Sequence, residues 1–133
     1  MYQPYKPQGV NTANVYLINK DLAALIYFVE QTFNAQVIEK VTRPGGSVAH
    51  AEIRIEDSTI MAGAASENFK ECTAGIYVYV ADCDASYAKA LEAGAVSVMR
   101  PQTRHDEKER YGGVKDSNGN TWWIASYYQP KAG

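Results

Sequence analysis

This sequence has no strong charge excess and no long apolar run, and each absence excludes a class of partner. Its 133 residues include 13 Lys and Arg against 15 Asp and Glu, a net charge of −2. A protein that binds phosphate backbones normally has a basic excess, so we expect no nucleic-acid partner. No apolar run approaches the roughly 18–20 residues needed to cross a bilayer, so we also expect no membrane partner.

Cysteine is scarce as well. Cys72 and Cys83 are the only two, and they lack the CxxC spacing of thiolate zinc sites. Two such thiols favour a reduced cytosolic protein over a disulfide-stabilised one. The N-terminal segment has neither a basic stretch nor an apolar core, so no secretory signal is expected. We therefore expect a cytoplasmic protein whose residues 1–133 form a single domain.

Phenylalanine occurs only three times, whereas tyrosine occurs ten times and tryptophan twice. Tyr and Trp combine an apolar ring with a polar tip, which suits grooves and subunit interfaces that are partly wet. The alternative is that these rings simply line the edge of the core.

A repeated pattern is the most informative feature of the chain. Residues 15–21 and 76–82 each form an alternating apolar strand that ends in Asp, at an offset of 61 (76 − 15). An amphipathic helix follows each copy, then a corner of small residues, Asn34-Ala35 or Gly94-Ala95. Two half-sized units of one topology predict a pseudo-symmetric fold with a groove between the halves.

Each unit is expected to follow the order βαβββ. Asp21 is the expected N-cap of the first helix, and the second helix is expected over Asp84–Ala93. We therefore predict an α+β fold in which two βαβββ modules, about residues 10–64 and 74–128, form a curved mixed sheet with a groove. A polar connector (64–73) joins them, and a charged loop is expected at 102–110. The expected strands are 13–20, 36–41, 50–55, 59–62, 75–81, 95–101, 111–115 and 120–127.

Short motifs lie in order along nearly the whole chain: Pro7-Gln8-Gly9, Tyr16-Leu17-Ile18 with Asp21, His50–Ile55, Asp82–Ala85, Gly94-Ala95, Arg110-Tyr111-Gly112 and Lys115–Ala125. With the duplicated pattern, they resemble the vicinal oxygen chelate superfamily. This superfamily includes glyoxalase I, extradiol dioxygenases and the bleomycin- and fosfomycin-resistance proteins. The chain looks most similar to its PhnB-like branch. The resemblance implies the fold more strongly than any one activity, because this fold hosts many activities.

The resemblance also implies where a metal would bind. Catalytic members hold a divalent ion with His or Glu side chains from four strands, and the matching positions here are Asn14, Met61, Tyr77 and Trp123, with Gly63 as the alternative to Met61. None of these residues is a His or a carboxylate. Amide, thioether, phenol and indole groups are poor ligands for such ions near neutral pH. We therefore expect no metal and no cofactor at this position.

Strand alternation predicts which side chains line the open face of the sheet, opposite the helices, and it places Trp122 in the core and its neighbour Trp123 on the open face. The resulting mixture of aromatic and polar groups is typical of a small-molecule pocket. A dimer interface filled by the partner's side chains is the alternative. Arg110 and Tyr111 match a motif of the branch and are expected at the rim. The predicted ligand-binding residues are Asn14, Tyr16, His50, Glu52, Arg54, Met61, Tyr77, Tyr79, Arg110, Tyr111 and Trp123.

His50, Glu52 and Arg54 share one face of a strand and are the candidate catalytic group. His50 would carry a proton, Glu52 would orient it, and Arg54 would bind an anionic substrate. The alternative is a structural network in which Glu52 pairs with Arg54 or Lys115 and His50 bonds to a backbone group.

Three functions follow as hypotheses. The first is a metal-free protein that binds, and so sequesters, a small organic ligand such as a drug or metabolite. We expect it to be a homodimer, because related bleomycin-binding proteins build their grooves across two chains by exchanging strands. The second is a lyase, isomerase or dioxygenase-like enzyme that uses a noncanonical metal or the His50–Glu52 pair. The third is a structural or regulatory homodimer whose groove is filled by its own side chains.

Overall fold

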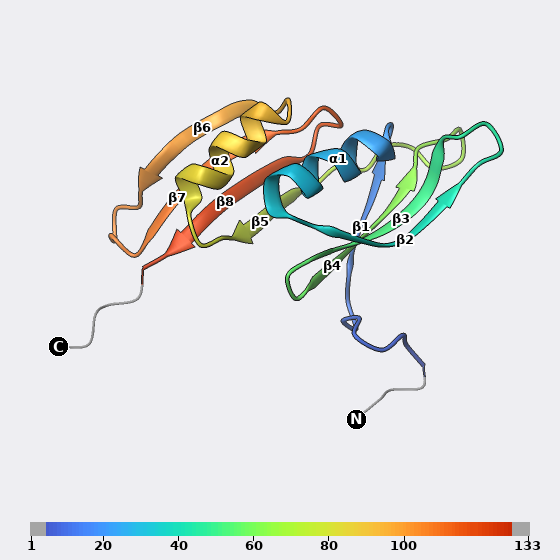
Figure 1. Cartoon of the computed structure of the whole chain (residues 1–133), viewed down its shortest axis with the longest axis horizontal. Helices are drawn as coiled ribbons and strands as arrows, with labels where there is room; N and C mark the ends of the chain where they lie inside the picture. Colours follow the sequence, from blue (N-terminus) through green and yellow to red (C-terminus); the bar gives the residue numbers. More distant parts are fainter. Residues whose placement is uncertain (1–4, 129–133) are drawn as a thin grey trace.

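The computed structural model describes residues 5–128, which form two sheets and two helices (Figure 1). The first module contains β1 (Val15–Asn19), α1 (Leu22–Phe33), β2 (Gln36–Thr42), β3 (Val48–Ile55) and β4 (Ser58–Ala64). The second contains β5 (Gly75–Tyr79), α2 (Cys83–Glu92), β6 (Val96–Thr103), β7 (Glu109–Lys115) and β8 (Thr121–Tyr127). The predicted α+β class with two βαβββ modules is confirmed.

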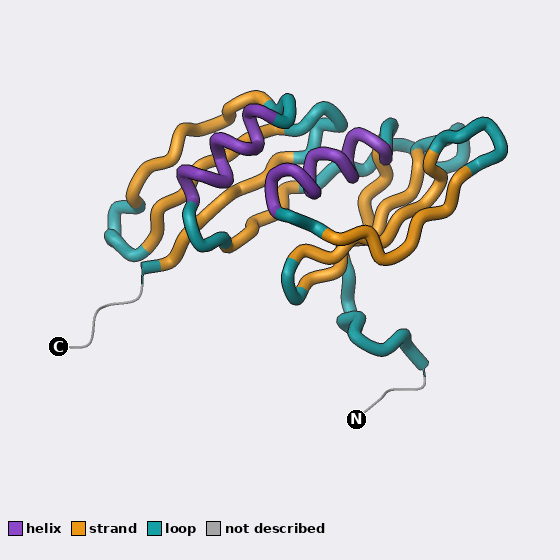
Figure 2. Tube along the Cα trace, viewed as in Figure 1, coloured by secondary structure: helices purple, strands orange, loops and turns teal. Residues whose placement is uncertain are grey.

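The two sheets have the same mixed topology. Their strand orders are β1-β4-β3-β2 and β5-β8-β7-β6. β1 pairs with β4 in parallel and β5 pairs with β8 in parallel, while the remaining pairs are antiparallel. Figure 2 shows the two helices next to each other, with α2 over the second sheet and α1 between the two sheets. The repeat in the sequence is therefore a repeat in the fold.

Both helices begin at an Asp N-cap. The Asp21 carboxylate accepts a hydrogen bond from the Ala24 N–H at 3.0 Å, and Asp82 accepts one from Ala85 at 3.1 Å. Each cap satisfies one of the free N–H groups in the first turn of its helix. The second helix consequently begins at Cys83, one residue earlier than predicted, because Asp82 rather than a later residue is its cap.

Side chains from both modules form one hydrophobic core. Trp122 of β8 is fully buried, and its ring centroid lies 5.5 Å from the rings of both Phe28 and Phe33 on α1. Aromatic pairs at this separation add to the stabilisation that comes from area burial alone. The expected inward position of Trp122 is confirmed, and this ring joins the second sheet to the first helix.

Buried amides join the modules at a second place. Asn120 Nδ2 donates a hydrogen bond to Asn19 Oδ1 at 2.8 Å, and both residues are fully buried. The Asp116 carboxylate in turn accepts hydrogen bonds from Asn120 and from the indole N–H of Trp122. Buried polar groups need such partners, so this network fixes one relative position of β1 and β8.

The charged segment predicted as a loop at 102–110 is shorter than expected. β6 continues to Thr103 and β7 begins at Glu109, so the connection covers only residues 104–108. This extension places Glu109 inside a strand, which matters for the site below. Within residues 5–128, no helix is long and apolar enough to span a bilayer.

Candidate functional site

The open face of the first sheet carries a Tyr–His pair. The ring centroids of Tyr16 and His50 lie 6.0 Å apart. The Tyr16 phenol also covers Gly63, where a Cβ atom would lie only 2.7 Å from the Tyr16 hydroxyl oxygen. Met61 is the cross-strand neighbour of both Tyr16 and Glu52. The structure thus brings four predicted ligand-binding residues together here.

The open face of the second sheet is aromatic. Tyr77 pairs with Trp123, and Trp123 pairs with Gly113 on the next strand. The Trp123 ring lies over Gly113, because a Cβ atom there would approach its Cζ3 to 2.6 Å. The absent side chain at Gly113 therefore allows the indole to lie flat along the sheet.

Glu109 anchors this aromatic face. Its carboxylate accepts hydrogen bonds from the Tyr77 hydroxyl at 2.5 Å and from the Tyr79 hydroxyl at 2.6 Å. Arg104 forms an ion pair with the same carboxylate at 3.3 Å, and Glu109 is only 4% exposed. The sequence predicts Glu109 in a charged loop, whereas it is the first residue of β7. Alternation continued two residues back from Tyr111 would have placed it on this face.

Burial and the hydrogen bonds of this cluster shift the pKa values of its three groups. Burial, followed by the bond to Glu109, raises the pKa of Tyr77 well above its ordinary value. The bond to Glu109 is the main reason that the pKa of Tyr79 is raised, and the two phenol donors lower the pKa of Glu109 itself. Near neutral pH the phenols are therefore neutral and the carboxylate is ionised.

The candidate catalytic group of His50, Glu52 and Arg54 has a further neighbour, on β2, that the sequence does not predict. Glu39 is the cross-strand neighbour of Glu52, and the ligand atoms of Glu39, His50 and Glu52 all lie within 4.8 Å of one another. His50 Nε2 is 3.8 Å from a Glu52 oxygen. Arg54 instead donates to the Gly9 carbonyl oxygen at 2.6 Å. Within residues 5–128, Glu52 forms no ion pair with either Arg54 or Lys115, the partners of the structural alternative.

The two predicted rim residues point to different sides. Arg110 forms two hydrogen bonds with the Asp84 carboxylate of α2, at 2.6 and 2.9 Å. Its side chain therefore lies on the side of the sheet that the helix covers. Tyr111, the next residue in β7, lies on the opposite, open face.

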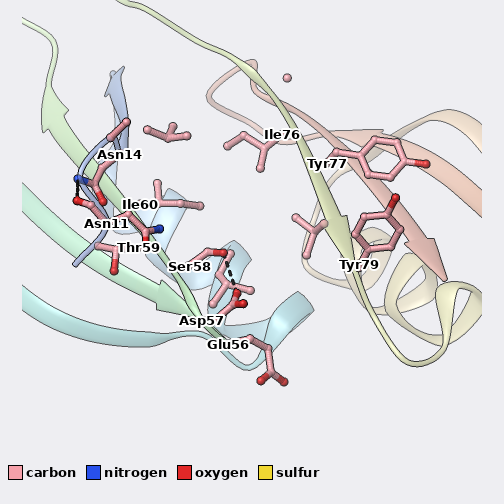
Figure 3. Close-up of a pocket in the computed structure, with 15 residues that line it drawn as sticks. Asn11, Asn14, Glu56, Asp57, Ser58, Thr59, Ile60, Ile76, Tyr77 and Tyr79 are labelled. Atoms are coloured by element: carbon pink, nitrogen blue, oxygen red, sulfur yellow. Dashed lines mark hydrogen bonds between the residues drawn. The ribbon is translucent and has the colours of Figure 1, made fainter. Parts of the chain in front are cut away.

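A cleft of about 540 Å³ lies between the modules (Figure 3). One wall comes from β1 and the β3–β4 turn, and the other comes from β5. Three predicted ligand-binding residues line it, namely Asn14, Tyr77 and Tyr79. Figure 3 shows the two tyrosine rings extending from β5 away from the labelled residues of the first module.

The four positions that match the superfamily's metal ligands do not suit a divalent ion. The Asn14 side-chain N–H₂ donates to the Asn11 carbonyl at 2.8 Å, and the Tyr77 hydroxyl donates to Glu109. Trp123 lies over Gly113 and offers no lone pair. Met61 supplies only a thioether, which is a poor ligand for a hard ion. This donor set contains no imidazole and no carboxylate.

A family model described as the Glyoxalase/Bleomycin resistance protein/Dioxygenase superfamily matches residues 10–124. The chain belongs to this superfamily. The superfamily predicted from the sequence motifs is thereby confirmed.

Known superfamily relatives include proteins of different kinds. Mb0911c of Mycobacterium bovis, an uncharacterised protein, is 31% identical over 120 residues, which cover 80% of this chain and 77% of the relative. A glyoxalase/bleomycin resistance protein/dioxygenase family enzyme from Burkholderia phytofirmans PsJN is 20% identical, with a TM-score of 0.72 over 87% of this chain and all of that chain. The fosfomycin resistance protein FosX of Listeria monocytogenes was solved as a point mutant in complex with Mn(II) and 1S,2S-dihydroxypropylphosphonic acid. It is 16% identical, with a TM-score of 0.66 over 86% of this chain and 87% of that one. At these identities, the two solved structures support the fold alone.

Proposed function

We propose that this protein binds a small organic molecule and does so without the divalent metal of its catalytic relatives. The observation that carries the proposal is the cleft of about 540 Å³ between the modules. Its size falls in the range typical of small-molecule sites, which are mostly apolar with a few placed polar groups. Within the superfamily, the Arg110-Tyr111-Gly112 and Lys115–Ala125 motifs favour the PhnB-like branch.

The absence of metal-binding side chains at the superfamily positions supports binding rather than metal-assisted chemistry. Tyr77, which stands at one of those positions, uses its hydroxyl to hold Glu109. The FosX relative was crystallised with Mn(II) and a phosphonic acid, so the fold accommodates a small anionic ligand with a metal. In this chain the same positions carry an amide, a thioether, a phenol and an indole instead.

We also propose that the protein is a homodimer. Tyr16, Tyr77 and Tyr79 are 51%, 44% and 58% exposed in the single chain. Tyr77 and Tyr79 form one exposed aromatic patch, since their ring centroids lie 5.4 Å apart, and such patches are typical of interaction sites. Light scattering coupled to size-exclusion chromatography tests this directly, and a monomer at all concentrations would contradict it.

Two measurements on the purified protein test the binding proposal. Metal analysis by inductively coupled plasma mass spectrometry should find less than stoichiometric zinc, nickel, manganese and iron. A thermal-shift screen of small aromatic and phosphonate compounds should find stabilising ligands, because a ligand that binds only the folded state raises the melting temperature. No stabilisation by any compound would favour the structural or regulatory dimer with a filled groove.

Substitution of residues that line the cleft provides the matched test. Tyr77→Ala and Ile76→Ala, at two residues that line the cleft, should each weaken a ligand found in the screen by roughly fivefold or more, the loss expected when a large apolar contact of about 1–3 kcal/mol is removed. Tyr27→Ala on the outer surface of α1 is the control, since Tyr27 is exposed and lies outside this cleft. Unchanged affinity in both cleft variants would contradict the proposal.

One observation favours a second function, an enzyme that uses a noncanonical metal. Glu39, His50 and Glu52 bring an imidazole and two carboxylates within 4.8 Å, a ligand set suited to manganese, iron or zinc. Isothermal titration with each metal chloride would then reveal a stoichiometric site. Binding that is lost in both His50→Ala and Glu39→Gln would support the enzyme. Binding of none of these metals would exclude this route.

A further inference from the structure

The rim of the inter-module cleft carries charge of one sign. Glu56 and Asp57 line the cleft from the turn between β3 and β4, where Glu56 has a left-handed φ of 52°. None of the described residues that line the cleft is Lys, Arg or His. The two carboxylates of this rim attract a cation, and the positive side chains of Lys89 and Arg54 line adjoining hollows that Glu56 shares with the cleft.

The polar groups of the cleft also include acceptors with unused capacity. Asn14 Oδ1 is buried, and it accepts no hydrogen bond from any described residue, whereas its N–H₂ group donates to Asn11. The Asp57 carboxylate accepts one side-chain hydrogen bond, from the Ser58 hydroxyl at 3.0 Å. A ligand that brings N–H donors would satisfy more of these groups than one that brings acceptors.

Apolar side chains line much of the rest of the cleft. Val15 and Ile60 lie on the first-module side, and Ile76 and Val78 project from β5 on the other side. Figure 3 shows Ile76 facing the first module, with Asp57, Ser58 and Glu56 at one end of the opposite wall. The two carboxylates thus lie at one end of the cleft, next to these apolar side chains.

The charged groups on the far side of β5 do not offset the negative charge of the cleft rim. Glu109 is held by Tyr77 and Tyr79, and its charge is balanced by the Arg104 guanidinium at 3.3 Å. Arg104 also pairs with Asp106 at 2.9 Å, so this group adds no positive field at the cleft.

We propose that the cleft selects an apolar molecule with a protonated amine. The ammonium group lies at Glu56 and Asp57, and the apolar body lies between Ile60 and the β5 side chains. This inference rests on the proposed function, because it names the ligand class for the same cleft. The attraction is modest and sensitive to salt, since both carboxylates are near the surface.

Three probes on one indole skeleton test the selection. Tryptamine is a cation, tryptophol is neutral and indole-3-acetate is an anion at pH 7, while their sizes are nearly equal. Each is titrated into the full-length ¹⁵N-labelled protein, and dissociation constants are taken from the amide shifts of Ile60, Ile76 and Val78. Tryptamine should bind about fivefold more tightly than tryptophol at low salt, from one ion pair at the rim. Indole-3-acetate should bind most weakly.

A charge-removing variant identifies the origin of the preference. In the Glu56→Gln/Asp57→Asn double variant, tryptamine and tryptophol should bind equally, with the affinity for tryptophol unchanged. Glu67→Gln removes an acid that does not line the cleft and should keep the preference. Equal binding of tryptamine and tryptophol by the native protein would overturn this inference and leave the proposed function standing. A preference for tryptamine over tryptophol that persists in the double variant would also overturn this inference and leave the proposed function standing. No shift at the cleft with any probe would overturn both.

Discussion

Asn118 and Asp21, 97 positions apart, form a reciprocal pair of hydrogen bonds. The Asp21 N–H donates to Asn118 Oδ1 at 2.9 Å, and Asn118 Nδ2 donates to the Asp21 carbonyl at 2.8 Å. The β7–β8 turn of the second module is thereby bonded to the residue that caps the first helix. Together with Asn19 and Asn120, this pair fixes the two walls of the cleft relative to each other.

Loss of this pair should destabilise the whole chain. Asn118→Ala removes both bonds and leaves the partly buried Asp21 N–H without its acceptor, whereas the Asp21 carbonyl keeps its bond from the Leu25 N–H. We expect a cost of about 1–3 kcal/mol. The free energy of unfolding in urea measures the loss. Ser117→Ala, at an exposed neighbour in the same turn, should change it by less than about 0.5 kcal/mol. Equal effects of the two substitutions would indicate that the turn, and not the pair, determines stability.

A methyl group at Gly113 should displace Trp123. In Gly113→Ala the added Cβ would lie 2.6 Å from the indole ring, so the ring must move, at a cost of about 1–3 kcal/mol. Tryptophan fluorescence and near-ultraviolet circular dichroism should both change. Gly45→Ala is the matched control, because nothing lies within 4 Å of the new atom there. An unchanged tryptophan spectrum in Gly113→Ala would contradict the position of the ring.

The Glu109 cluster should make stability depend on pH in the acid range. The pKa of Glu109 is lowered by the hydrogen bonds from Tyr77 and Tyr79, so its folded-state value lies below its unfolded value. Its stabilising contribution is therefore complete above the unfolded pKa, about 4.5, and is lost as the pH falls through the folded pKa.

Comparison with Glu109→Gln tests this dependence. The difference in melting temperature between the native protein and the variant should be largest at about pH 6–7 and should shrink toward about pH 3. Glu92→Gln on α2, which removes an exposed carboxylate outside the cluster, serves as the charge-matched control and should show no comparable trend. A constant difference across this pH range would mean that the Glu109 carboxylate is not stabilised by the phenols.

Arg110 should be dispensable for ligand binding. Its guanidinium is bonded to Asp84 on the helix side, away from the open face. Arg110→Ala should leave the affinity for a cleft ligand within about twofold, and its small effect on melting temperature should vanish at high salt, as for exposed ion pairs. Tyr111→Ala provides the comparison on the open side. A tenfold loss of affinity in Arg110→Ala would contradict this expectation and support the rim position that the motif predicts.

The sequence predicted the fold well because its evidence was local and repeated. Strand alternation, the Asp21 cap and the corner at Asn34 are each decided by near neighbours, and the second module repeats them. The predicted inward position of Trp122 followed from the same alternation. These features needed no knowledge of which distant segments meet.

The candidate site was predicted less completely because its decisive contacts are long-range. Glu109 lies in a charged stretch that is typical of a loop, and only its phenol partners on β5 give it a buried position. Glu39 joins His50 through pairing of β2 with β3, which the sequence does not encode in any motif. Arg110 was assigned to the rim from a motif match, whereas its partner on α2 decides its actual side.

The position of Trp122 between Phe28 and Phe33 has a consequence for the repeat itself. Either unit produced alone would present part of its interior to water, the first at two phenylalanine rings and the second at an indole. Such a half-length polypeptide could hide that surface only by associating with another molecule. Joining two copies in tandem turns this concentration-dependent encounter into a permanent intramolecular one.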